Sequence, residues 1–371
     1  MISRRAFCRM TAAASVLAQT RLGSVAGAEE VEQVPSLCAL AKERGLLYGS
    51  EIEFNPIKND PDYAALVARH CAIVTPGNEA KWTHTEPQRN SFSFDSLDWL
   101  VDFAETHKLQ IRGHNLVWNA FNPPWVDQAA PSPDARAVLT THISTVVGRY
   151  KGRIQYWDVV NEPTDPRWHP QADYLVNGIW HKDLGGAYVD IAFETTKAQD
   201  PKAILFINDD GLEYADDLST QKRALYLHLV ESLVKKGVPI SGFGLEAHLL
   251  PHRPFAGKDY RQFLAELAGM GLTLHVTELD VNDKSFPEDV STRDRLCADY
   301  CKQFLETALD EKAVKALLTW GMSDRYNWIN KGKTPNRADG LPSRSFPFDT
   351  DLRPKPLYYV LADALRNAPI R

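Results

Sequence analysis

The sequence predicts an α/β fold, a single-domain (β/α)8 TIM barrel. Short apolar or β-branched runs alternate eight times with longer amphipathic stretches, a pattern typical of parallel strands joined by helices. Polar residues follow nearly all of the short runs, at the strand ends where barrel enzymes carry their active sites. No Gly-x-Gly-x-x-Gly turn follows the first run, which argues against an open doubly wound sheet.

The predicted strands are the eight short runs, at residues 46–52, 73–79, 110–118, 156–162, 203–209, 242–248, 273–280 and 316–324. The predicted helices lie between them and carry apolar residues at spacings of three and four. The main ones span residues 95–108, 133–150, 186–199, 220–236, 260–269 and 292–310, and a closing helix spans 357–365.

A closed barrel would bring side chains from several strand ends to one opening. In an open sheet, ligand-binding groups concentrate instead at one switch point. Here polar and aromatic candidates come from six strand ends: His114, Asn161, Glu162, Asn208, His248, Glu278 and Trp320. Their spread along the chain therefore favours the barrel.

The chain divides into a leader and one domain. Residues 1–28 resemble a twin-arginine signal peptide, with Ser3-Arg4-Arg5-Ala6-Phe7, a weakly apolar run and an Ala26-Gly27-Ala28 cleavage site. We expect export by the twin-arginine pathway, to the periplasm or out of the cell, and a single catalytic barrel at residues 29–371. No later run of eighteen apolar residues occurs, so no membrane span is expected.

Composition excludes several classes of protein. The net charge is −6 and charges of both signs are interspersed, so no nucleic-acid partner is predicted. The four cysteines after the leader, Cys38, Cys71, Cys297 and Cys301, show no disulfide framework, and we expect buried free thiols. His114, His248 and His275 lie on three strands, and His275 should point away from the face of Glu278. We therefore predict no metal site and no cofactor.

Two predicted strands end in a glutamate. One contains the run Tyr156-Trp157-Asp158-Val159-Val160-Asn161-Glu162-Pro163, and the other contains the run Leu274-His275-Val276-Thr277-Glu278-Leu279-Asp280. Cleavage of an acetal needs one protonated carboxyl group for the leaving oxygen and one ionised group for the oxocarbenium-like carbon. A single strand-end glutamate is more often part of a surface ion pair. Two of them facing one opening favour glycoside cleavage.

These strand ends resemble glycoside hydrolase family 10, the retaining endo-β-1,4-xylanases. The resemblance rests on Asn161-Glu162-Pro163, Thr277-Glu278-Leu279-Asp280, Arg112-Gly113-His114-Asn115-Leu116-Val117-Trp118, Asn208-Asp209 and Trp320-Gly321-Met322-Ser323-Asp324. It extends from about residue 49 to 365, with the motifs in the family's order. It implies hydrolysis of β-1,4 bonds in xylan through a covalent glycosyl-enzyme, with carboxyl groups about 5–5.5 Å apart.

The resemblance implies catalytic roles for four residues. Glu162 matches the acid/base and Glu278 the nucleophile. Asn161 matches the amide that holds the 2-hydroxyl of the cleaved sugar. His248 matches the imidazole that hydrogen-bonds the nucleophile, with Asp280 as its partner.

The resemblance also implies a set of substrate-binding residues. Asn78, Lys81 and Trp82 match a motif on the non-reducing side of the cleft. His114 and Trp118 match third-strand residues, and Trp320 and Trp328 match aromatic platforms. Asn208 and Glu246 complete the predicted set.

Four residues depart from the family's pattern. Gly77 stands where a glutamate is usual, Asn119 where a histidine or lysine is common, and Phe121 where a glutamine is usual. Glu246 replaces the glutamine of Gln-x-His. We expect weaker binding in the distal subsite and, from Glu246, raised pKa values for the coupled carboxylates as a set.

We therefore expect a monomeric enzyme whose partner is a polysaccharide, xylan or xylo-oligosaccharides. The departures leave open the same retaining chemistry on another β-linked substrate, such as a mixed glucan or an aryl cellobioside. A carbohydrate-binding protein without hydrolytic activity and a metal-dependent hydrolase are further alternatives. The intact set of Glu162, Glu278, Asn161 and His248 argues against the former.

Overall fold

The computed structural model describes residues 34–128, 133–167, 175–332 and 336–371. The predicted signal peptide at residues 1–28 lies outside these ranges.

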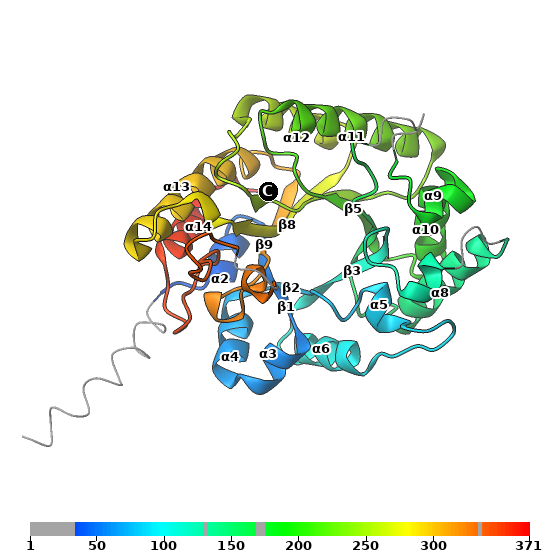
Figure 1. The fold of residues 1–371 in the computed structure, drawn as a ribbon, viewed down its shortest axis with the longest axis horizontal. Helices are drawn as coiled ribbons and strands as arrows, with labels where there is room; N and C mark the ends of the chain where they lie inside the picture. The colour runs from blue at the N-terminus through cyan, green and yellow to red at the C-terminus, as the bar shows by residue number, and fades with distance from the viewer. Residues whose placement is uncertain (1–33, 129–132, 168–174, 333–335) are drawn as a thin grey trace, which may run out of the picture.

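Parallel strands close into an eightfold barrel, which confirms the predicted fold (Figure 1). Hydrogen bonding runs from β6 through β5, β4, β3, β2, β1 and β9 to β8, and β6 also pairs with β8 to close the ring. The strands are β1 Leu47–Ile52, β2 Ile73–Pro76, β3 Gln110–Trp118, β4 Tyr156–Asn161, β5 Ile204–Asp209, β6 Gly242–Leu245, β7 His248–Leu249, β8 Thr273–Val281 and β9 Val314–Thr319.

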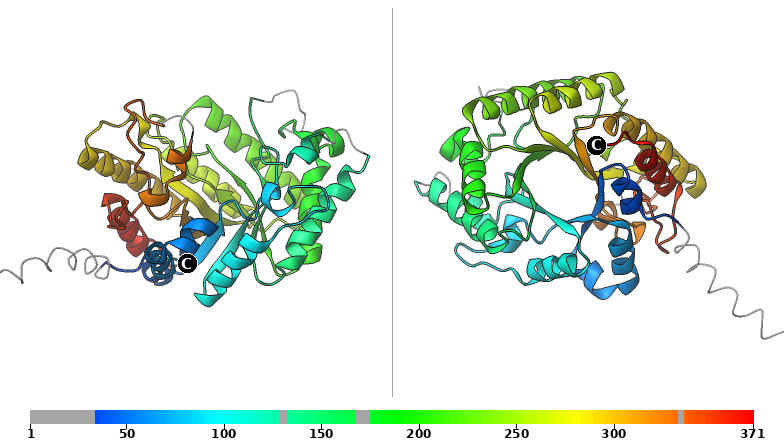
Figure 2. Two further views of the ribbon diagram at one scale, coloured as in Figure 1. Left: turned by 60° about the horizontal axis from the view of Figure 1, so that its bottom comes forward. Right: turned by 180° about the vertical axis from the view of Figure 1, so that it is seen from behind.

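Helices surround the barrel on its outer face, as the two further views show (Figure 2). The longer ones begin and end within three residues of the predicted bounds. The helices are α2 Leu37–Lys42, α3 Phe54–Asn59, α4 Pro61–His70, α5 Trp82–Thr85, α6 Asp95–Thr106, α7 Pro124–Asp127, α8 Ala135–Arg149, α9 Ile179–Leu184, α10 Ala187–Gln199, α11 Asp217–Lys236, α12 Gly257–Gly269, α13 Val290–Ala308 and α14 Pro356–Asn367, with short 3-10 turns η1 Asp283–Ser285, η2 Asp324–Tyr326 and η3 Trp328–Lys331.

Aspartates set the start of several helices. Asp60, Asp216 and Asp289 each accept a backbone N–H from the first turn of α4, α11 and α13. Such caps satisfy amides that the helix itself leaves unpaired. Gly237 ends α11 in the left-handed region, with φ of 75°, which a residue without a Cβ adopts readily.

Three predicted strands are shorter than expected or interrupted. The strand predicted at 73–79 ends at Pro76. The strand predicted at 242–248 divides into β6 and β7 around Ala247, whose φ of 62° lies in the left-handed region and breaks the extended conformation. The strand predicted at 316–324 ends at Thr319, and Asp324 instead begins η2. The residues beyond these strand ends therefore lie in loops that follow the strands.

The N-terminal half of the barrel interior is an apolar plug. Ile73, Ala316 and Leu318 pack together, with Leu47 and Tyr156 against them. Side chains at alternate positions of each strand face this interior. The plug fills this part of the barrel with apolar side chains, whereas the polar candidates lie toward the strand C-termini.

A charged layer lies between the plug and the opening. Arg112 forms a buried ion pair with Asp158, and its Nη1 lies 3.0 Å from Nδ1 of His275. Burial and the neighbouring Arg112 hold the pKa of His275 well below its usual value. His275 is therefore neutral, and its Nδ1 accepts a hydrogen bond from the guanidinium.

The prediction that His275 points away from the face of Glu278 is wrong. Strict alternation would separate residues three apart, but β8 shifts register against β9 between Val276 and Leu279. This irregularity adds a residue within the strand. Both His275 and Glu278 consequently face the barrel interior.

Four cysteines are present in the described residues, and all are free thiols, as predicted. Cys71, Cys297 and Cys301 are buried as expected, whereas the expectation of a buried thiol is wrong for Cys38, which is partly exposed. Among the described helices, none combines the length and the apolar character that crossing a bilayer requires.

Candidate active site

The opening of the barrel brings together most of the predicted site residues. Hydrogen bonds and close ion pairs connect side chains that lie on β3, β4, β5, β7 and β8 or directly after β6. The residues joined in this way are His114, Asn161, Asn208, Glu246, His248 and Glu278. The sequence placed them up to 164 positions apart, and the closure of the barrel makes them neighbours.

Glu278 lies on β8 and is held by three side chains. Its Oε1 accepts a hydrogen bond from Nδ2 of Asn208 at 2.8 Å and lies 3.7 Å from Nδ1 of His114. Its Oε2 lies 3.3 Å from Nε2 of His248. Burial raises the pKa of Glu278, but His114, His248 and Asn208 outweigh it and lower the pKa below its usual value. The carboxylate is therefore ionised, as a nucleophile requires.

His248 links Glu278 to Asp280. Its Nδ1 lies 2.9 Å from Oδ2 of Asp280, which also accepts the indole N–H of Trp328 at 2.8 Å. Burial opposes a charge on the imidazole, but Asp280 and Glu278 raise the pKa of His248 well above its usual value. Both ring nitrogens are therefore protonated and donate, one to each carboxylate.

Asn208 connects three acceptors at the centre of the opening. Its Nδ2 lies 2.9 Å from Oδ1 of Asn161, 2.9 Å from Oε1 of Glu246 and 2.8 Å from Oε1 of Glu278. Its Oδ1 accepts the hydroxyl of Thr277 at 2.8 Å, which fixes the orientation of the amide. Asn208 thereby positions Glu278 and the amide of Asn161 together.

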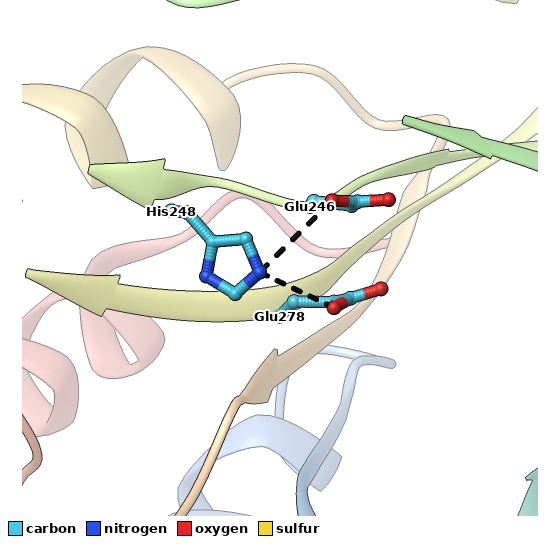
Figure 3. Close-up of side chains that lie close together, drawn as sticks. All are labelled: Glu246, His248 and Glu278. Atoms are coloured by element: carbon cyan, nitrogen blue, oxygen red, sulfur yellow. Dashed lines mark ion pairs between the residues drawn. The ribbon is translucent and has the colours of Figure 1, made fainter. Parts of the chain in front are cut away.

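Glu246 is buried beside Glu278, as Figure 3 shows. Its Oε2 lies 3.9 Å from Nε2 of His248. Burial and the adjacent Glu278 raise the pKa of Glu246 well above its usual value. Of the coupled carboxylates, Glu246 has a raised pKa, whereas His114, His248 and Asn208 keep the pKa of Glu278 below its usual value.

Glu246, His248 and Glu278 are also close enough to consider as metal ligands. One ligand atom from each lies within 4.8 Å of the other two. A metal would require an unprotonated imidazole nitrogen and ionised carboxylates. The surroundings favour protons on both His248 nitrogens and on Glu246. The group therefore fits a shared proton network better than a cation.

Glu162 directly follows β4 with a φ of 46°, an uncommon value for a residue with a side chain. Its backbone N–H donates to the carbonyl of Asn208 at 2.9 Å, and the indole of Trp118 donates to its Oε2 at 3.0 Å. Burial and the charge of Asp210 raise the pKa of Glu162 to about 7. Glu162 thus keeps a proton near neutral pH, as a general acid requires.

The sequence analysis did not identify two residues that affect the pKa of Glu162, namely Lys222 and Asp210. Lys222 on α11 bridges Asp209 at 2.6 Å and Asp210 at 2.8 Å. Lys222 lowers the pKa of Glu162 and Asp210 raises it. Asp210 could have been noticed as a second carboxylate after β5, whereas Lys222 comes from a helix that carried no signal.

Aromatic side chains line the opening. The ring of Trp320 lies 5.2 Å from that of His114 and 6.2 Å from that of His248, both edge-on. Trp328 is 42% exposed. Phe121 is 40% exposed and stacks on Trp118, with ring centroids 4.6 Å apart. Flat rings of this kind can stack on sugars, so Phe121 extends the platform of Trp118.

Asn78 and Lys81 lie at the β2 side of the opening. The Lys81 ammonium lies 3.3 Å from Oδ1 of Asn78 and 4.7 Å from the ring centre of Phe121. Burial lowers the pKa of Lys81, and Glu278 and other carboxylates oppose this effect. Both side chains are positioned to reach a ligand in the opening.

The structure corrects the prediction that Trp82 contacts substrate. Its side chain is 2% exposed and lies between His142, at 3.7 Å between ring centres, and Trp180, at 5.1 Å. Its indole N–H donates to Oε2 of Glu86 at 3.0 Å. Both faces are covered, so Trp82 packs the wall of the barrel and offers no surface to a sugar.

Two hollows lie near the strand C-termini, one beside Glu162 and one beside Asn78. One of about 330 Å³ is lined by Trp118, Glu162, Asp165, Asp210 and Lys222, among others. The other, of about 320 Å³, is lined by Glu53, Asn78, Glu79 and His84, among others.

A barrel whose mouth holds one protonated and one ionised glutamate defines the class of glycoside hydrolases. The chain belongs to glycosyl hydrolase family 10, because the family's sequence profile matches residues 36–364. This confirms the family predicted from the strand ends.

Individual relatives agree with this assignment. Endo-1,4-beta-xylanase 2 of Claviceps purpurea is 34% identical over 331 residues, which cover 88% of this chain and 94% of the relative. Endo-1,4-beta-xylanase B of Thermotoga neapolitana is 30% identical over 308 residues, or 82% and 84% of the two chains. The crystal structure of xylanase 10B from Thermotoga maritima superposes with a TM-score of 0.80 at 29% identity, covering 89% of this chain and 98% of that one.

Proposed function

We propose that the protein is a retaining endo-β-1,4-xylanase, with Glu162 as acid/base and Glu278 as nucleophile. The observation that carries this proposal is the opposite perturbation of the two carboxyl groups. Burial and Asp210 raise the pKa of Glu162 to about 7, whereas His114, His248 and Asn208 overcome burial and lower that of Glu278. The names of the relatives support xylan as substrate.

In the first step, the Glu278 carboxylate attacks the anomeric carbon as Glu162 donates its proton to the leaving oxygen. The C–O bond to the leaving sugar breaks, and an ester to Glu278 forms. Asn208 and protonated His248 hold the carboxylate in one orientation before attack. As Glu278 loses its charge, the pKa of Glu162 falls, because the ionised Glu278 had raised it.

In the second step, ionised Glu162 removes a proton from water, which attacks the same carbon and releases Glu278. Two inversions at one carbon give net retention. Trp118 donates its indole N–H to Glu162 and stabilises the ionised form that this step needs. Asn161, held by Asn208, is positioned to bind the 2-hydroxyl of the sugar on Glu278.

Reducing-sugar release from xylan tests the activity, with Glu278→Gln and Glu162→Gln as matched variants that keep the side-chain shape. We expect either change to lower kcat/KM on xylan by on the order of 10³-fold or more. NMR of the first product should show the β-anomer. Xylan hydrolysis that survives Glu278→Gln, or an initial α-anomer, would overturn the mechanism.

A second candidate is the same chemistry on a β-glucan or an aryl cellobioside. The exposed Phe121, stacked on Trp118, places an aromatic surface where a polar residue is usual and gives this candidate its support. Parallel assays on xylan and barley glucan separate the two. Faster release from glucan would assign the enzyme to the second substrate.

We also propose that residues 29–371 form the mature enzyme, exported by the twin-arginine pathway to the periplasm or the medium and active as a monomer outside the membrane. The support for export is the paired Arg4-Arg5 with the cleavage site at Ala26-Gly27-Ala28. N-terminal sequencing of the exported protein and its mass in solution test both points. A mature chain that still begins at Met1 would overturn the first.

A further inference from the structure

Glu51 carries a carboxyl group on the inner face of β1. Leu47, four residues earlier, packs in the apolar plug of the barrel. Alternate residues of a strand share a face, so Glu51 also points into the barrel, but near the C-terminal end of β1. There it lies opposite Thr75 of β2, one strand from the loop that carries Asn78 and Lys81.

Gly77 gives the carboxyl group of Glu51 its place. A Cβ built on Gly77 would lie 2.1 Å from Oε1 of Glu51 and 2.8 Å from its Cδ. No real side chain tolerates so close an approach, so the two positions are coupled. The carboxyl group of Glu51 thus fills the space beside β2 that a side chain at position 77 would occupy.

The other carboxyl groups at this edge already have protein partners. Glu53 accepts the amide N–H of Asn78 at 2.8 Å, and Lys331 pairs with it. Glu79 accepts the backbone N–H of Phe54 at 2.7 Å. By contrast, no hydrogen bond reaches the Glu51 carboxyl group from any residue that the structure describes.

The charged groups around Glu51 favour a carboxyl group that can bind a ligand. The ammonium groups of Lys81 and Lys331 attract its carboxylate, while burial and the neighbouring Glu53 and Glu79 raise its pKa well above the usual value. A carboxyl group that gains a proton can donate as well as accept. It is therefore suited to a sugar hydroxyl, which does both.

We infer that Glu51 binds a hydroxyl of the sugar on the non-reducing side of the cleft, supplying from β1 the carboxyl group that Gly77 cannot supply from β2. This inference rests on the proposed function, because it names a specificity-determining residue of the same site. Glu51 holds substrate away from the scissile bond and takes no part in bond cleavage.

The test compares 4-nitrophenyl β-xylobioside, which places two sugars on the non-reducing side, with 4-nitrophenyl β-xyloside, which places one. Glu51→Ala should lower kcat/KM on the bioside about tenfold and leave the xyloside unchanged, as loss of one hydrogen bond predicts. The control is Glu43→Ala, which removes an exposed carboxylate after α2, at the opposite end of the barrel. Equal losses on both substrates, or none on the bioside, would overturn the inference.

A double-mutant cycle with Gly77→Ala tests the coupling. The added Cβ should displace the Glu51 carboxyl group and cause a similar loss on the bioside in the wild type, but little further loss when Glu51 is already alanine. Additive losses would contradict the shared position. If the wild type cleaves the cellobioside and not the xylobioside, xylan is the wrong substrate, and the same comparison of cellobioside with glucoside still decides the role of Glu51.

Discussion

Asp210 gives the most direct test of how the site keeps Glu162 protonated. The pKa of Glu162 rises from 4.5 to about 7, and burial is the largest cause, followed by Asp210. Lys222 and Trp118 lower the pKa and offset part of these two contributions. The side chain of Asp210 is 51% exposed, and solvent screens its charge. We expect Asp210→Asn to lower the pKa of Glu162 by about 0.5.

The assay is kcat/KM on an aryl xylobioside as a function of pH, which reports the ionisations of the free enzyme. Activity should fall above pH 7 as Glu162 loses its proton, and Asp210→Asn should move this alkaline limb to lower pH. The control is Asp165→Asn, since Asp165 lines the same hollow but pairs with Arg167 at 2.7 Å. An alkaline limb that stays in place, or moves to higher pH, would refute the electrostatic account.

Three further predictions concern protonation. Glu246→Gln should leave the acidic limb of the kcat/KM profile unchanged, because Glu246 is already neutral there; a shifted acidic limb would contradict this. Dialysis against EDTA should leave kcat/KM on xylan unchanged, since His248 and Glu246 hold protons; activity restored only by a divalent cation would contradict it. Buried His70 has a pKa of about 3, against 6.5 when unfolded. The free energy of unfolding is therefore unaffected by His70 above pH 6.5, and it falls by about 1.36 kcal/mol per pH unit as pH drops from 6.5 toward 3, because only the unfolded state binds the proton. Urea unfolding at pH 7 and at pH 4 measures this fall in the free energy of unfolding, which should be about 3 kcal/mol smaller in His70→Gln than in the wild type. Equal falls in the two proteins would exclude His70 as the cause.

The sequence predicted the barrel because its strands and helices carry local patterns. Helix ends such as those of α11 follow from Asp216 and Gly237, whose preferences act within a few residues. The glutamates were found for the same reason, since Glu162 and Glu278 each end an apolar run. Where backbone geometry departs from regular alternation, as at Ala247 and in β8, the predictions for a strand end and for His275 were wrong.

Side-chain surroundings were beyond the reach of local patterns. Trp82 matched a binding motif, but His142 and Trp180, which cover it, lie 60 and 98 residues away. No local pattern in the sequence indicated that the carboxyl group of Glu51 lies against Gly77.

The sequence by itself therefore determined the fold, the family and the two glutamates, because these depend on residue type and spacing. Only the tertiary structure gave the physical reason why Glu162 keeps its proton and Glu278 does not. That difference comes from burial, from Asp210 near Glu162, and from His114, His248 and Asn208 around Glu278. Electrostatic interactions act through space, so the ionisation of each group depends on residues that the closed barrel brings near it.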